Sequence, residues 1–304
     1  IDTTAPTLSA ALLADTGASA SDGLTFDARF AGSASDDVGV VQLLGQLDPA
    51  TPDARFADLT TLLETDGAFT LSRSTLDALA DGTLADGAHT LRVVAIDAAG
   101  NRSEVVERHF TLDSHVATPT LQLAFDTGSD DHDRITLTGT LNVAGSEAGA
   151  TVEYSIDAGA SWAPSFTAVE GDNHVAVRQT DLAGNVSLLA TLAFVLDTLA
   201  PTLTHLDLAP ESDSGTLGDR ETSATLAIVV GRSEAGASVR LLGSDRQTTA
   251  NGDGVFTFPD LPLALGDNHF DFVASDTAGN ETATRVTIVR VPPPITDTSA
   301  PTLN

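Results

Sequence analysis

The sequence predicts an all-β protein made of tandem antiparallel β-sandwiches that form an elongated rod. Three observations carry this prediction. Short runs of apolar residues alternate with polar ones, turn-forming residues interrupt these runs at intervals of roughly ten residues, and four sequence signatures recur in the same order along the chain.

Alternation with period two is clearest in residues 24–30, 135–141 and 174–180, and it predicts strands that pack on one face. Clusters of Gly, Asp, Asn and Ser between such runs supply turns. Units of roughly 80 to 110 residues suit a two-sheet sandwich of about seven strands. Residues 53–63 form the one helix-like stretch, which we interpret as an insertion or a short helical turn.

The first signature is an Asp followed four to six residues later by Pro-Thr-Leu, and it opens each unit. It begins at Asp2, Asp113, Asp197 and Asp297. The predicted domains are therefore 1–112, which has a longer central insertion, 113–196 and 197–296, with 297–304 as the start of a next repeat or a linker. The opening residues resemble these internal unit starts rather than a signal peptide, which indicates a piece of a longer array.

Three further signatures place acids at fixed points of each unit. Asp-x-x-Gly-Asn occurs near each unit's end as Asp97 to Asn101, Asp181 to Asn185 and Asp276 to Asn280. An Asp-Thr-Gly or Asp-Ser-Gly turn pairs Asp15 with Asp22, Asp126 with Asp133, and Asp213 with Asp219. Ser-Glu-Ala-Gly-Ala supplies Glu147 and Glu234, and the first unit has Asp36 and Asp37 at that place.

The sandwich topology brings these acids to the ends of the units. One end of each unit holds the opening Asp, the Asp-x-x-Gly-Asn turn and the acid of the Ser-Glu-Ala-Gly-Ala motif. The Asp-Thr-Gly turn lies at the other end, facing the next unit. Most of the acids are therefore expected at the junctions between units.

Calcium is the cation that these acids favour. Calcium takes six to eight oxygen ligands, whereas zinc and copper favour His or Cys, and magnesium prefers rigid octahedral sites. Carboxylates placed side by side cost about 1–4 kcal/mol per pair unless a cation compensates them. The predicted ligands near the unit starts are Asp2, Asp36 or Asp37, Asp97 and Asn101, then Asp113, Glu147, Asp181 and Asn185, then Asp197, Glu234, Asp276 and Asn280.

The pairs Asp15 and Asp22, Asp126 and Asp133, and Asp213 and Asp219 are a second predicted set of calcium ligands. The alternative for a single copy of either motif is an ordinary tight turn, because Gly and Asn tolerate left-handed backbone and Asp caps turns. The recurrence of several acids in step favours metal binding.

Composition excludes several classes of function. The 14 basic residues, all Arg, stand against 43 acidic ones, and the net charge is −29. Nucleic acid and anionic membranes require a cationic face, so neither is an expected partner. No apolar run is long enough to span a membrane. The lack of Cys and Met fits export to an oxidising environment.

No catalytic site is predicted. No Ser/His/Asp set or phosphate-binding loop occurs, and no carboxylate pair stands apart from the repeated motifs. His89, His174 and His269 recur once per unit, just before a predicted strand, which favours a structural role. Trp162 is expected to fill one end of a sandwich core, with stacking on a sugar as the alternative.

Taken together, the motifs resemble the bacterial Ig-like repeats of giant, type I-secreted, biofilm-associated adhesins. The resemblance covers the chain and is best in the second and third units. It implies Ig-like sandwiches, calcium at the domain junctions and a monomeric extender at the cell surface or outside the cell. Such an extender would project a ligand-binding region that lies elsewhere in the parent protein, and it would contact the neighbouring repeats. The alternatives are an Ig-like domain that itself binds a host or matrix glycan or protein, and a spacer in a secreted enzyme.

Overall fold

The computed structural model describes residues 2–51 and 54–293. The predicted start of a further repeat at 297–304 lies outside the described residues. The chain forms two compact units, the first of Ile1–Leu121, Val143–Ser165 and Ala176–Thr191, the second of Gln122–Asn142, Phe166–Val175 and Leu192–Asn304. The predicted second repeat has residues in both units, so the boundaries of the three repeats stay a prediction. Below, the first, second and third repeat mean residues 1–112, 113–196 and 197–296.

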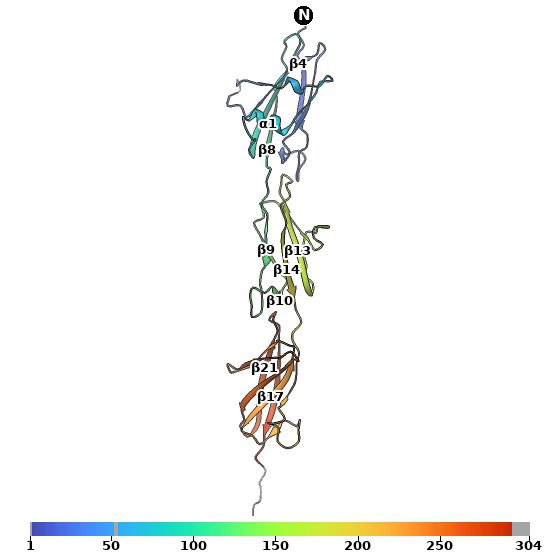
Figure 1. Cartoon of the computed structure of the whole chain (residues 1–304). Helices are drawn as coiled ribbons and strands as arrows, with labels where there is room; N and C mark the ends of the chain where they lie inside the picture. Colours follow the sequence, from blue (N-terminus) through green and yellow to red (C-terminus); the bar gives the residue numbers. More distant parts are fainter. Residues whose placement is uncertain (1, 52–53, 294–304) are drawn as a thin grey trace, which may run out of the picture. The chain divides into compact units, whose positions relative to one another are not determined.

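Residues 7–112 form two sheets, drawn from blue to cyan in Figure 1. The three-stranded sheet has the order β1-β3-β6, with β1 at Thr7–Leu12, β3 at Phe30–Ser35 and β6 at Ala68–Leu71. The five-stranded sheet has the order β2-β8-β7-β4-β5, with β2 at Leu24–Thr25, β4 at Val40–Leu47, β5 at Ala57–Asp58, β7 at Gly87–Asp97 and β8 at Val106–Leu112. Their core contains Phe30, Phe69 and Leu91, each at most 1% exposed.

Residues 120–196 contain a four-stranded and a two-stranded sheet. The first has the order β10-β14-β13-β12, with β10 at Ile135–Thr136, β12 at Thr151–Ser155, β13 at Gly171–Thr180 and β14 at Ala190–Leu196. The second pairs β9 at Thr120–Leu123 with β11 at Leu141–Ala144. The buried apolar side chains here include Val175, Val177 and Phe194.

Residues 203–290 again form two sheets. One has the order β15-β17-β20, with β15 at Leu203–Leu208, β17 at Leu226–Ser233 and β20 at Val255–Pro262. The other has the order β16-β22-β21-β18-β19, with β16 at Glu221–Thr222, β18 at Ser238–Leu241, β19 at Gln247–Thr249, β21 at Gly266–Ser275 and β22 at Glu281–Arg290. Three packed rings, Phe256, Phe258 and Phe272, lie in its core.

The predicted all-β class is confirmed, because α1 is the one α-helix in the described ranges and strands make up nearly all other regular structure. The predicted strands at 24–30 and 135–141 are each broken in two. β2, β10 and β16 pair parallel with β8, β14 and β22, while the strands after them join the other sheet. A fully buried Thr, Thr25 in the first case, sits where the chain changes sheet.

The helical prediction at 53–63 is only partly right. This stretch holds β5 and one 3-10 turn, η1 at Thr60–Leu62, whereas residue 53 lies outside the description. The α-helix, α1 at Arg73–Leu79, lies later in the chain. Ser72 caps it by accepting the Thr75 N–H, and Leu76 anchors it in the core. No helix in the described part of the chain is long and apolar enough to cross a membrane.

Candidate metal sites

The acids predicted to cluster in the first repeat do so. Asp2, Asp36 and Asp97 each place a carboxylate oxygen within 4.8 Å of the others. Asp97 ends β7 and is 1% exposed, Asp36 follows β3, and Asp2 precedes β1. Residues far apart in the sequence are thus brought together by the two sheets that end at this point.

Hydrogen bonds from its own turn fix the Asp97 carboxylate. Oδ1 accepts the N–H groups of Ala99 and Asn101, both at 2.8 Å, and Oδ2 accepts the Asn101 side-chain amide at 2.8 Å. Gly100 has a φ of +91°, which the turn requires and which Gly adopts without strain. Burial raises the pKa of Asp97, but the hydrogen bonds from Asn101, Ala99 and Gly100 outweigh it and hold the pKa below its usual value.

Asp36 has one satisfied and one unsatisfied oxygen. Oδ1 accepts the Val38 N–H at 3.0 Å, whereas Oδ2 is buried and has no hydrogen-bond partner among the described residues. A buried carboxylate oxygen without a partner is costly, and a cation bound there would remove that cost. Asp37 is exposed and lies outside the cluster, so of the two adjacent acids it is Asp36 that lies close to Asp2 and Asp97.

The second repeat has the same turn at Asp181. Its Oδ1 accepts the N–H groups of Gly184 and Asn185 at 2.7 and 2.8 Å, and its Oδ2 accepts the Asn185 amide at 2.7 Å. The same amide donates to the main-chain oxygen of Asp113 at 2.8 Å. The turn is therefore tied to the acid that opens its own repeat.

In this second cluster, the pKa of Asp113 is raised above its usual value. Burial is the main cause of its raised pKa. The hydrogen bond from the His115 N–H opposes this effect, and the nearby carboxylates of Asp181, Asp86 and Glu147 each raise the pKa by a smaller amount. The sequence analysis missed Asp86, whose Oδ1 accepts both the N–H and the hydroxyl of Ser114. Like charges crowd around Asp113 without a cationic side chain among those causes.

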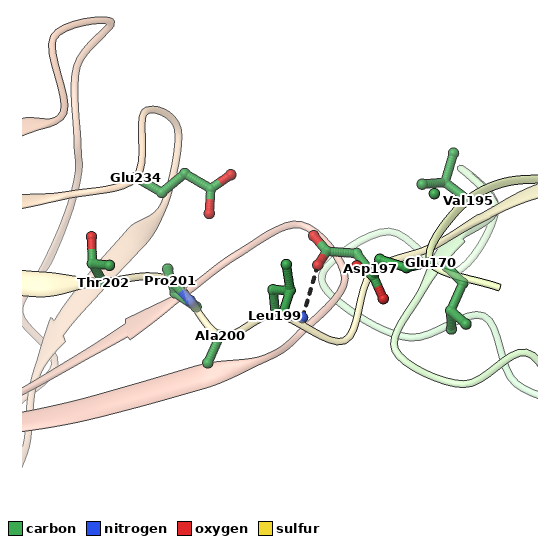
Figure 2. A pocket seen from close by; sticks show the side chains of 10 residues that line it. Glu170, Val195, Asp197, Leu199, Ala200, Pro201, Thr202 and Glu234 are labelled. Carbon is green, nitrogen blue, oxygen red and sulfur yellow. Dashed lines mark hydrogen bonds between the residues drawn. The ribbon is translucent and has the colours of Figure 1, made fainter.

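The third repeat is built in the same way, but Glu234 is exposed where Glu147 is partly buried. Asp276 accepts the N–H groups of Gly279 and Asn280 at 2.8 and 2.9 Å, and the Asn280 amide donates to the main-chain oxygen of Asp197 at 2.8 Å. Figure 2 shows Asp197 and Glu234 at a pocket of about 580 Å³. Neither this set nor the second has three carboxylate oxygens within 4.8 Å in the described ranges.

The second predicted set also shows a repeated feature. Asp15, Asp126 and Asp213 each have a buried Oδ1 without a hydrogen-bond partner in the part of the chain described. Each Oδ2 accepts a backbone N–H, from Gly23, Arg134 and Gly218 respectively. The companion acids Asp22, Asp133 and Asp219 each cap the backbone two residues on, by accepting the N–H groups of Leu24, Ile135 and Glu221. The same unsatisfied oxygen thus recurs in three turns.

Two further side-chain groups lie outside the predicted acidic clusters. Asp130, Asp131 and His132 form a three-residue group that the sequence analysis missed, but all three are exposed and adjacent in sequence. Trp162 is partly buried, and the Arg178 guanidinium lies 4.0 Å from the centre of its ring while pairing with Glu153. One face of the indole is therefore covered by Arg178.

The recurring histidines are not placed before strands as predicted, because His89, His174 and His269 lie inside β7, β13 and β21. His89 contacts Asp48 at 2.6 Å and the Ala85 oxygen at 2.8 Å, and His269 contacts the Thr287 hydroxyl at 2.9 Å. Each imidazole contact involves its own sandwich rather than the acidic clusters.

Residues 2–114 match the bacterial Ig-like domain family. The resemblance that the motifs predicted is thereby confirmed for this part of the chain. No curated protein matches the chain significantly.

Solved structures similar to this chain include repeats of large bacterial adhesins. A tetra-tandem repeat from the extending region of a large adhesion protein is 19% identical, with a TM-score of 0.29, over 93% of this chain and 74% of that one. A structure from a 1.5-MDa bacterial ice-binding adhesin is 17% identical, with a TM-score of 0.31, over 94% and 98%. The sialic acid binding region of a Streptococcus sanguinis adhesin is 15% identical, with a TM-score of 0.26, over 96% and 79%.

Proposed function

We propose that this chain is an extender segment of a bacterial surface or secreted adhesin and that calcium at its acidic clusters stiffens it. The observation that carries the proposal is the convergence of Asp2, Asp36 and Asp97 with a buried, unpartnered Asp36 oxygen. The role is structural rather than enzymatic, and the ligand-binding part of the adhesin lies outside this segment.

The donor groups suit calcium. Every candidate ligand offers oxygen, from carboxylates and from Asn, and none offers nitrogen or sulfur as zinc or copper would favour. A net charge of −29 makes the surroundings attractive to any cation. The pKa of Asp113 is raised by burial and by nearby carboxylates, and no cationic side chain is among the causes. Bound calcium would supply the missing positive charge.

The residues themselves would hold the start of each repeat against its last turn. Asn185 joins Asp181 to the main chain at Asp113, and Asn280 joins Asp276 to the main chain at Asp197. A cation shared by these acids would strengthen the same connection, because the acids come from both segments. Asp15, Asp126 and Asp213 would use their unsatisfied oxygens in the second kind of site.

Two measurements test the proposal. Titration calorimetry on the chain should detect calcium binding, and calcium at 100 times its dissociation constant should add about 2.7 kcal/mol per site to the free energy of unfolding. Small-angle scattering should show a larger maximum dimension with calcium than with a chelator. Absence of binding contradicts the calcium sites, whereas binding with an unchanged maximum dimension contradicts only the stiffening.

A further inference from the structure

The Asp-Thr-Gly turn of the first repeat makes direct contact with the last turn of the second repeat, inside the first compact unit. The Thr16 hydroxyl makes hydrogen bonds in both repeats, including one of 3.1 Å with the Thr25 hydroxyl. It accepts the Phe26 N–H from its own repeat at 2.9 Å and donates to the Ala183 main-chain oxygen at 2.6 Å. The Ala18 N–H adds a bond to the Leu182 oxygen at 3.2 Å.

The two backbones approach so closely that neither can carry a side chain at the contact. A Cβ on Gly17 would lie 2.0 Å from the Leu182 oxygen, and a Cβ on Gly184 would lie 2.9 Å from the Gly17 nitrogen. Both distances are shorter than real Cβ contacts. The glycines of the two motifs are therefore required by each other as well as by their own turns.

The second compact unit repeats this contact with the next pair of turns. Thr127 accepts the Leu137 N–H at 2.8 Å and donates to the Ala278 oxygen at 2.5 Å. A Cβ on Gly128 would lie 1.9 Å from the Thr277 oxygen, and one on Gly279 would lie 3.0 Å from the Gly128 nitrogen. Both copies thus share the Thr hydroxyl donor, its Ala main-chain acceptor and the close approach of the two glycines, whereas the Ala18 N–H bond belongs to the first copy.

Two further turns, one of each kind, have no such partner among the described residues: the turn with Ala99 and Gly100, and the turn with Ser214 and Gly215. Ala183 and Ala278 are 0% exposed, whereas the equivalent Ala99 is exposed, and a Cβ on Gly100 would meet nothing within 4 Å. At the other position, a Cβ on Gly215 would also meet nothing within 4 Å. Burial of the Ala thus follows the presence of a preceding Thr-Gly turn.

The Ser214 turn is already arranged for the same contact. Its hydroxyl accepts the Ser223 N–H at 2.7 Å, as Thr16 and Thr127 do with their own repeats. Gly215 has a φ of +102°, close to the +89° of Gly17. The hydroxyl bond and the Gly φ of this turn therefore match the other two copies, although Asp213 accepts an N–H five residues on, where Asp15 and Asp126 accept one eight residues on.

We propose that the Thr-Gly or Ser-Gly turn and the Asp-x-Ala-Gly-Asn turn form a metal-independent joint between consecutive repeats. The unpartnered halves, at Ser214 with Gly215 and at Ala99 with Gly100, take a further repeat that carries the complementary turn. The occupant is a repeat of this type because the site admits only a Gly-flanked backbone with a small, buried Ala. The joint uses a hydroxyl, an amide and carbonyl oxygens, so it does not rest on the proposed calcium sites.

Hydrogen–deuterium exchange on the whole chain, in chelator, tests the joint. The amides of Gly184 and Asn185 donate to Asp181 within their own turn, so they report how often this turn opens. They should be protected in the wild type, and Gly17→Ala should speed exchange at 182–185 by about fivefold or more, as expected when the turn loses contacts worth about 1 kcal/mol. Gly128→Ala should act in the same way at 277–280 and leave 182–185 unchanged. Gly215→Ala is the matched control, since it adds similar backbone strain without a neighbour, and it should alter neither segment.

A second variant separates the hydrogen bond from turn strain. Thr16→Val should speed exchange at 182–185, and Thr16→Ser should restore it, because Ser keeps the hydroxyl. Unchanged exchange at 182–185 in both Gly17→Ala and Thr16→Val, or an equal effect of Gly215→Ala, overturns the joint. Calcium titrations of the same variants report on the metal sites separately.

A tandem duplication in which residue 296 of the first copy is joined to Asp2 of the second keeps the spacing of the repeats and tests the unpartnered halves. Residues 98–100 occur once in each copy, and only those of the second copy follow a Ser-Gly turn. Their peptide should show two exchanging populations, one protected and one as in the single chain. Gly215→Ala in the first copy should merge the two populations. A single population in the duplication, with the exchange rate of the single chain, overturns this part of the proposal.

Discussion

The side-chain amide of Asn185 donates a hydrogen bond to the main-chain oxygen of Asp113, over 2.8 Å and 72 residues of sequence. Asn185→Ala should therefore free the start of the repeat from its last turn. It removes this bond and the one to Asp181, so we expect the free energy of unfolding to fall by about 1–3 kcal/mol. Urea unfolding of the chain in chelator measures the change.

Asn185→Asp is the charged counterpart of that variant. It places a third carboxylate beside Asp181 and near Asp113, so in chelator it should destabilise the chain at least as much as Asn185→Ala. Added calcium should recover more stability in Asn185→Asp than in Asn185→Ala, because the new carboxylate can bind a cation. Equal recovery in both variants would argue against a cation at this cluster.

Adjacent acids provide a matched pair for the first cluster. Asp36→Asn should weaken calcium binding there by about tenfold or more, since it removes the charge of an oxygen that has no other partner. Asp37→Asn removes the same charge from an exposed residue outside the cluster and should change binding much less. Calorimetric titration of both variants distinguishes them, and a larger effect of Asp37→Asn would reverse the assignment.

Thr25 is expected to be essential for the change of sheet after β2. Its hydroxyl is 0% exposed, lies 3.1 Å from the Ala14 oxygen and accepts the Asp27 N–H at 2.9 Å. Thr25→Val keeps the shape but removes the hydrogen bonds to these partly buried groups, so it should cost about 1–3 kcal/mol of unfolding free energy. Thermal or urea unfolding measures this cost.

Thr111 supplies the control for Thr25. It pairs with Leu24 in the neighbouring strand β8, and its side chain is exposed. Thr111→Val should change the unfolding free energy by no more than about 0.5 kcal/mol. Similar costs for Thr25→Val and Thr111→Val would show that the buried hydroxyl contributes nothing special.

Asp157 provides a prediction on pH. Hydrogen bonds from the Ser161 hydroxyl and N–H, and from Ser155, lower the pKa of Asp157 to about 2. A carboxyl group whose pKa is lower in the folded state stabilises the fold above its unfolded pKa and loses that contribution as the pH falls through the folded value. Stability should therefore decline between about pH 4 and pH 2, and Asp157→Asn should flatten that decline in acid unfolding curves. An unchanged pH profile would contradict the role of these hydrogen bonds.

The fold class and the turn chemistry were predictable because they depend on local patterns. The same turn recurs with Asp97, Asp181 and Asp276 at its first position. The Gly three residues after each Asp has a φ above +90°. Alternating apolar residues predicted the strands. Both signals lie within a few residues of sequence, so no knowledge of distant neighbours is needed.

Long-range relationships were not predictable in the same way. The break after Thr25 depends on which sheet each half joins, and the choice of Asp36 over Asp37 depends on where Asp2 and Asp97 lie. Thr16 and Ala183 are 167 residues apart. Helix α1 was missed because it has only seven residues, although Ser72 is a residue type that favours a helix N-terminus.

The hydroxyl of Thr16 contacts Phe26 and Thr25 in its own repeat and Ala183 in the repeat that follows. Neither turn can therefore evolve freely while the other stays fixed. Repeats that keep both turns are interchangeable parts: duplication, deletion or recombination at the unit boundaries preserves every contact of this kind. A gene that lengthens or shortens by whole units would thus retain working connections, which lets the reach of the protein change without the redesign of any sandwich.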